Sequence, residues 1–211
     1  MPDRFPLVLR LLHWTMALLV LAMLFVGVGM VSTAGAAYPR LLALHRPIGI
    51  AILVLVAIRL AIRLSTKAPP LPADLPRAQV IAAKGSHVLL YLALFGMPLI
   101  GWAMLSAGGY PVRIAPGLAL PPILPQNGYA FGLLRLAHGL IAFAFFALIL
   151  GHLTIALVHG FVRRDGVLAS MGFGRRHPAG AAPAVPAVET EPAEAAAAPS
   201  DGEEAGAIAP P

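Results

Sequence analysis

The sequence contains no cysteine, and this absence excludes several kinds of site at once. Disulfide bonds, zinc sites with thiolate ligands, iron–sulfur clusters and haem attached through a CxxCH motif all require that residue. Any metal that the chain holds must therefore be bound by histidine, methionine or carboxylate side chains.

Charged residues are also scarce: they make up 11% of the 211 residues, while hydrophobic residues make up 59%. This composition is too apolar for a soluble globular domain and indicates a membrane protein. The formal net charge of +6 does not indicate a nucleic-acid partner, because the lysines and arginines lie at the ends of apolar runs. They form no basic stripe with interleaved aromatic residues, which nucleic-acid binding would favour.

An apolar stretch of about 20 residues is long enough to cross a membrane as a helix. Four stretches meet this requirement and predict an all-α integral membrane protein built as a four-helix bundle: residues 7–30, 44–64, 85–106 and 131–161. The first stretch is too long for a cleavable signal peptide and is followed by further membrane segments. These helices define a predicted domain at residues 1–173.

From residue 174 onward the chain is rich in alanine, proline and glutamate and has few large apolar residues. Such a composition cannot bury enough surface to offset chain entropy. We therefore expect residues 174–211 to form a disordered tail.

Basic residues predict the orientation of the helices. The connection between the second and third helices and the end of the fourth are both strongly basic, at Arg59, Arg63, Lys67, Arg77, Lys84, Arg163, Arg164, Arg175 and Arg176. By the positive-inside rule these ends are cytoplasmic, and so are both chain termini. The loop at residues 108–128 then lies on the outer side with a single charge, Arg113. We expect that loop to be ordered but irregular.

Histidines in or beside the predicted helices carry the chemistry, because an ionisable group in hydrocarbon is costly and indicates a functional site. Six such residues are present: His13, His45, His87, His138, His152 and His159. His138 and His152 are 14 positions apart, close to four helical turns, so both project from one face of the fourth helix. Because they are separated by about 21 Å along the axis, they can face two different metals but cannot share one.

The predicted depths match His45 with His138 on the outer side and His13 with His152 on the cytoplasmic side. Two such pairs are what bis-imidazole ligation of two stacked haems requires. A simple interhelical hydrogen bond is the alternative for any one histidine. A zinc or transport site is another alternative, but zinc ligands would converge at one point.

The remaining polar residues near the helix ends each allow two interpretations. His87 and His159 lie on the cytoplasmic side, where they could exchange protons with a quinone or simply be polar residues at the interface. Arg46 and Arg135 each lie close in sequence to an outer-level histidine, where they could pair with haem propionates or anchor the helix in the interface.

Four long stretches resemble the bacterial cytochrome b561 family of small four-helix di-haem proteins. They are RLLHW at 10–14, LHRPIG at 44–49, and the segments 87–112 and 136–168, within a similarity covering residues 4–172. The resemblance implies two non-covalent haem b groups, one held by His13 and His152 and the other by His45 and His138. It also implies ubiquinone as a partner and, as in at least one family member, oxidation of superoxide.

The sequence as a whole predicts a di-haem b-type cytochrome that transfers electrons across the bacterial inner membrane. The specific hypothesis is a superoxide:ubiquinone oxidoreductase, with Arg113 contributing to a positive rim that attracts the anion. One alternative is a membrane anchor subunit that passes electrons between quinone and a separate dehydrogenase. A non-redox transport bundle, which would hold no haem, is another.

Overall fold

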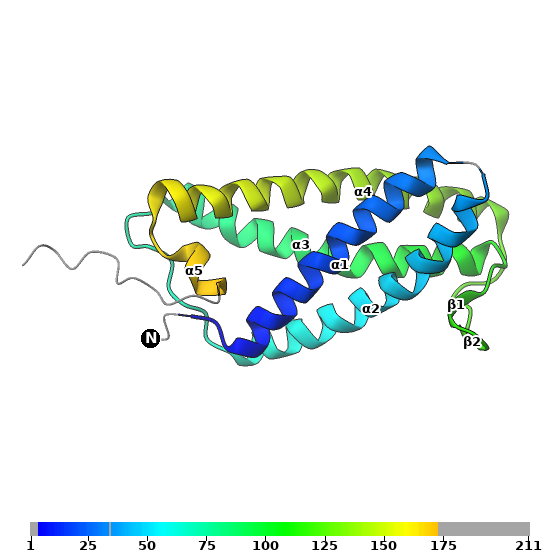
Figure 1. Ribbon diagram of the computed structural model, residues 1–211, viewed down its shortest axis with the longest axis horizontal. Coiled ribbons are helices and arrows are strands. Elements are labelled where there is room, and N and C mark those ends of the chain that lie inside the picture. Colours follow the sequence, from blue (N-terminus) through cyan, green and yellow to red (C-terminus); the bar gives the residue numbers. More distant parts are fainter. Residues whose placement is uncertain (1–3, 34, 173–211) are drawn as a thin grey trace, which may run out of the picture. The chain divides into compact units, whose positions relative to one another are not determined.

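The computed structural model describes residues 4–33 and 35–172. This part of the chain contains four long helices, α1 (Leu7–Ser32), α2 (Ala37–Ser65), α3 (Arg77–Ala107) and α4 (Gly128–Leu157), as Figure 1 shows. Each is long and apolar enough to cross a membrane. The predicted four-helix membrane fold is therefore confirmed, whereas the predicted tail at 174–211 lies outside the described residues.

Two of the helices begin about two turns before the apolar stretches that predicted them. α2 begins at Ala37 instead of residue 44, and α3 begins at Arg77, directly after Pro76, instead of residue 85. Polar and basic residues are tolerated in these first turns because the turns lie at the ends of the spanning segments. As a result, His45 lies about two turns inside α2 and not at its start.

Between α3 and α4 the chain forms a small antiparallel hairpin, β1 (Val112–Ala115) and β2 (Leu118–Leu120), which corrects the expectation of an irregular loop. Gly117 lies in its turn with φ +74°, a conformation that glycine adopts at little cost. The Trp102 indole donates a hydrogen bond of 2.9 Å to the Pro121 carbonyl. We call this end of the bundle the hairpin end (Figure 1).

At the opposite end, α4 continues as a π-helix, η1 (Val158–Arg163), and the chain then reverses into the short helix α5 (Val167–Met171). The Trp14 indole of α1 donates a hydrogen bond of 2.9 Å to the Met171 carbonyl. The Arg10 guanidinium donates a second bond, of 2.7 Å, to the Gly172 carbonyl. These bonds hold α5 against the start of α1, and we call this the α5 end.

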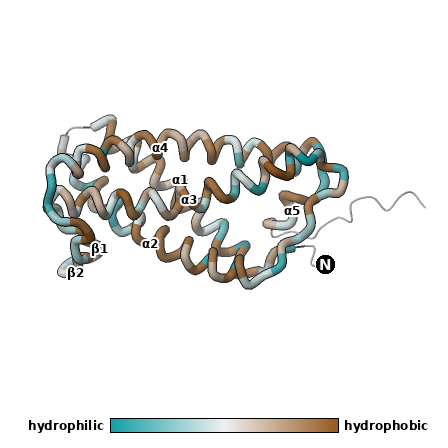
Figure 2. The backbone as a smooth tube through the Cα atoms, turned by 180° about the vertical axis from the view of Figure 1, so that it is seen from behind, coloured by the Kyte–Doolittle hydropathy of each residue, from teal (hydrophilic) through white to brown (hydrophobic). Residues whose placement is uncertain are grey.

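The long helices pack most closely as two pairs, α1 on α2 and α3 on α4, with a further contact between α2 and α3. Few large side chains of the described residues are buried; they include Leu9, Met16, Ile52 and Val56. Many apolar side chains are instead exposed along the helices, while hydrophilic residues gather toward the two ends (Figure 2). This distribution is expected of a bundle whose solvent is lipid.

Candidate functional site

The structure brings four of the predicted histidines together as two pairs. His45 of α2 faces His138 of α4, with ring centroids 6.1 Å apart and an angle of 63° between the ring planes. His13 of α1 faces His152 of α4, with centroids 6.3 Å apart and an angle of 80°. All four side chains are half-buried. Each pair therefore joins α4 to a helix of the α1–α2 pair, one nearer the hairpin end and the other nearer the α5 end.

The spacing of both pairs fits one metal ion between two imidazoles. Two metal–nitrogen bonds of about 2 Å, together with the distance from each nitrogen to its ring centre, separate the centroids by roughly 6 Å. The angle between the ring planes does not oppose this arrangement, because each ring can rotate about its metal–nitrogen bond. Across residues 4–33 and 35–172, no three His, Asp or Glu side chains are arranged as ligands of a single ion. This pattern suits an axially ligated haem better than a zinc site.

A glycine in α3 makes room for the pair nearer the hairpin end. A Cβ atom at Gly101 would lie 3.3 Å from Cε1 of His138, which is closer than ordinary van der Waals contact. The small residue therefore allows the His138 ring to lie against α3, and a larger side chain would displace it.

Buried nitrogens without a hydrogen-bond partner in the described part of the chain lie at this pair, among them Nδ1 of His45 and Nε of Arg46. Buried polar atoms in proteins are nearly always hydrogen-bonded, so such atoms commonly mark a ligand site. Arg46 is half-buried, whereas Arg135, the other predicted propionate partner, is exposed. Arg46 is therefore better placed to reach a buried anionic group.

The sequence did not place Arg59 in the candidate site, because Arg59 was assigned to the basic cytoplasmic connection. The structure places it inside α2, where it donates a hydrogen bond of 3.0 Å to the Tyr91 hydroxyl of α3. A second guanidinium nitrogen lies 3.5 Å from Nδ1 of His13. The signal in the sequence was a charged residue inside an otherwise apolar run, which is costly unless the residue is functional or paired.

His87 and His159 occupy different surroundings. The ring of His87 lies 5.7 Å from that of His152, so it adjoins the pair nearer the α5 end. Its Nδ1 lies 2.6 Å from the Ala83 carbonyl, and its side chain is exposed. His159 lies in η1, with Nδ1 2.6 Å from Oδ2 of Asp165. The sequence offered no reason to separate the two, but within residues 4–33 and 35–172 only His159 of the two has a carboxylate partner.

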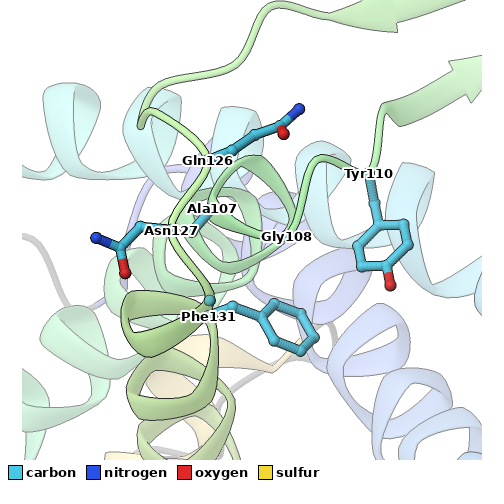
Figure 3. A pocket seen from close by; sticks show the side chains of 7 residues that line it. Ala107, Gly108, Tyr110, Gln126, Asn127 and Phe131 are labelled. Carbon is cyan, nitrogen blue, oxygen red and sulfur yellow. The ribbon is translucent and has the colours of Figure 1, made fainter.

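A cavity of about 340 Å³ lies at the hairpin end, between the last residues of α3 and the first turn of α4. Tyr110, Gln126 and Phe131 are among the residues that line it (Figure 3). Asn127 caps α4 by accepting a hydrogen bond of 3.0 Å from the Ala130 amide. The cavity contains none of the paired histidines and is not part of the histidine site.

Residues 4–174 match the family model described as prokaryotic cytochrome b561. The chain belongs to this family. Membership in this family identifies the chain as a b-type haem protein that transfers electrons. With its four membrane-spanning helices, it is a multi-pass protein of the bacterial inner membrane.

Three relatives match this chain over nearly their whole lengths. The chain is 29% identical to cytochrome b561 homolog 2 of Escherichia coli strain K12, over 81% of this chain and 92% of that protein. It is 33% identical to the probable superoxide oxidase CybB of Yersinia pestis, over 76% of this chain and 90% of that protein. It is also 27% identical to cytochrome b561 homolog 1 of the same E. coli strain, over 80% of this chain and 97% of that protein.

Proposed function

We propose that this cytochrome b561 family member oxidises superoxide on the outer side of the membrane and reduces ubiquinone on the cytoplasmic side. The observation that carries the proposal is the pair of cross-bundle histidine contacts at two depths, with centroids 6.1 and 6.3 Å apart. Two haems, one at each depth, would provide a path for electrons across the bilayer, whereas a single haem would not reach both sides. The similarity to a probable superoxide oxidase favours superoxide as the donor.

The distribution of basic residues supports the orientation. The basic residues at the α5 end include Arg63, Lys67, Arg77, Lys84, Arg163 and Arg164. The positive-inside rule places that end in the cytoplasm, and the hairpin end on the outer side. Under this orientation both chain termini are cytoplasmic.

Each histidine pair would hold one non-covalent haem b. His45 and His138 would bind the outer haem, with Arg46 and Arg135 near its propionates. His13 and His152 would bind the inner haem, with Arg59 beside His13. When bound, a b-type haem supplies a carrier of single electrons.

The remaining residues act at the two surfaces. Oxidation of two superoxide ions to two molecules of oxygen releases two electrons, and ubiquinone takes up these electrons and two protons to become ubiquinol. Arg113 is exposed on β1 at the hairpin end, where its charge attracts an anion. His87 and His159 lie toward the α5 end, where imidazoles can transfer protons to a quinone near neutral pH.

The test uses the purified protein in detergent. A reduced-minus-oxidised spectrum should show low-spin haem b, enzymatically generated superoxide should reduce that haem, and a water-soluble quinone should reoxidise it. His87→Gln and His159→Gln should keep the haem spectrum and slow only the reoxidation. Haem that superoxide does not reduce would contradict the proposed donor, while rapid reoxidation in both variants would contradict the proposed quinone side.

A further inference from the structure

The end of α4 has an unusual backbone. The last six residues before the turn form the π-helix η1, which contains both His159 and Arg163. π-helical turns are rare and frequent at functional sites. Immediately after η1 the chain reverses through Arg164, with φ +51°, and Gly166, with φ +80°. Asp165 lies between these two left-handed residues, and the reversal directs its side chain back onto η1.

Asp165 accepts three hydrogen bonds in this position. Its Oδ2 accepts one of 2.6 Å from Nδ1 of His159 and one of 3.0 Å from Nε of Arg163, while Oδ1 accepts one of 3.2 Å from the Val167 amide. The Asp165 side chain is only 12% exposed and that of His159 13%. A carboxylate held by three donors on both of its oxygens has little freedom to rotate.

The contact with Asp165 determines which nitrogen of His159 is available. Because Nδ1 bonds to the carboxylate, Nε2 is the nitrogen left to meet a substrate. A carboxylate in this position fixes the orientation and tautomer of the imidazole, and the ring, not the carboxylate, transfers the proton. His87 has no such partner among the described residues, since its Nδ1 faces the Ala83 carbonyl.

We propose that Asp165 is a positioning residue that holds His159 by Nδ1 and so presents Nε2 to the carbonyl oxygen of the quinone. The proposal rests on the quinone role of His159 proposed above. The protonated ring would give its Nε2 proton to one quinone oxygen as the quinone is reduced. The N–H bond breaks, an O–H bond forms, and water from the cytoplasmic surface restores the proton to Nε2. Asp165 stays ionised throughout.

A purely structural role for Asp165 is the competing explanation, because the same residue also holds the turn into α5. Asp74 offers a matched control. It bonds to the Arg163 guanidinium from the α2–α3 connection, its side chain is 71% exposed, and no hydrogen bond joins it to His159. Exposed ion pairs contribute little to stability, so the same Asp→Asn change at position 74 removes a carboxylate from the cluster without altering the histidine.

The experiment measures how fast a water-soluble quinone reoxidises pre-reduced haem in the full-length protein. The variants are Asp165→Asn, His159→Gln, their double variant and Asp74→Asn, each with its haem content and spectrum measured. We expect Asp165→Asn to slow the reaction about tenfold to a hundredfold, with its main effect on the limiting rate at saturating quinone and little on the quinone concentration that gives half of that rate. Asp74→Asn should react at nearly the normal rate.

The double variant separates positioning from structure. If Asp165 acts through His159, the double variant should be no slower than His159→Gln alone. Effects that multiply in the double variant, or a normal rate in Asp165→Asn while His159→Gln is slow, would overturn the positioning role and leave the quinone assignment intact. A normal rate in His159→Gln itself would overturn the quinone assignment, and with it the role of Asp165.

Discussion

Arg59 of α2 and Tyr91 of α3 are joined inside the membrane-spanning part of the bundle by a hydrogen bond of 3.0 Å from guanidinium to hydroxyl. The guanidinium carbon also lies 5.5 Å from the centre of the Tyr91 ring. Neither contact supplies a negative charge, and Nε of Arg59 is buried without a partner among the described residues. A cation in this position is stabilised by an anion, which a propionate of the proposed inner haem would supply.

The proposed ligation of His13 strengthens this requirement. The contact of 3.5 Å from Arg59 needs Nδ1 of His13 to act as the acceptor. An imidazole that binds a metal through Nε2 keeps its proton on Nδ1 and can no longer accept a hydrogen bond there. Arg59 would then need another acceptor, which a propionate of the proposed inner haem would supply.

The first prediction follows from the positive charge of Arg59. Arg59→Gln should lower the midpoint potential of the inner haem, because removing a nearby cation destabilises the reduced, less positive state. Arg59→Lys, which keeps the charge, should have a smaller effect. A spectroscopic redox titration of the purified variants measures both haems together. Unchanged potentials in Arg59→Gln would show that the cation does not act on the inner haem.

The second prediction concerns the histidine pairs. His45→Ala and His138→Ala should lose the same haem, and His13→Ala and His152→Ala should lose the other, because removing either axial ligand breaks the same site. Haem content and the positions of the α-bands in reduced spectra distinguish the two losses. His87→Ala is the control for the inner pair, since its ring also adjoins His152. If His87→Ala lost the inner haem and His13→Ala kept it, the pairing would have to be redrawn.

The third prediction concerns stoichiometry. Two histidine pairs imply two haem groups per chain, and acid acetone should extract both because the sequence has no cysteine to attach them covalently. Pyridine haemochrome absorbance against protein concentration gives the ratio. A value near one, or haem that stays with the precipitated protein, is the result that contradicts the model of two non-covalent groups.

The fourth prediction concerns pH. Burial raises the pKa of Asp165, but the hydrogen bonds from His159, the Val167 amide and Arg163 lower it by more, so this pKa lies below its ordinary value. Asp165 therefore stabilises the α5 end above its ordinary pKa of about 3.9. That contribution is lost as the pH falls from there through the lowered pKa of the folded state.

The measurement for this fourth prediction is hydrogen exchange at α5 in the unaltered protein and in Asp165→Asn. The two should differ most near neutral pH, where the unaltered protein should be better protected, and should converge in strong acid. A difference that is constant across this range would show that the charge of Asp165 is not responsible.

The sequence predicted the histidine pairs because their determinants are local and periodic. A spacing of 14 residues fixes His138 and His152 on one helical face, and apolar run lengths fix the depth of His13 and His45 closely enough to match them. The hairpin at 112–120 was missed because a segment rich in proline and glycine carries no alternating apolar pattern.

Arg59 and Asp165 were missed for a different reason. In the sequence, a basic residue such as Arg59 can indicate either membrane topology or a functional site. The folded bundle distinguishes the two, because it places Arg59 beside His13. The bond between His159 and Asp165 depends on η1 and on two left-handed residues that reverse the chain. Neither feature follows from helical periodicity, because each is set by tertiary packing at one end of the bundle.

The packing of the long helices has a consequence for biogenesis. The long helices form two helix pairs, α1 with α2 and α3 with α4, and both histidine pairs join the first helix pair to α4 of the second. We therefore expect each helix pair to enter the bilayer as a unit during synthesis. The binding of haem should then stabilise the contact between the two helix pairs. Cells short of haem should accumulate a protease-sensitive precursor, so the supply of the prosthetic group would set the amount of mature cytochrome.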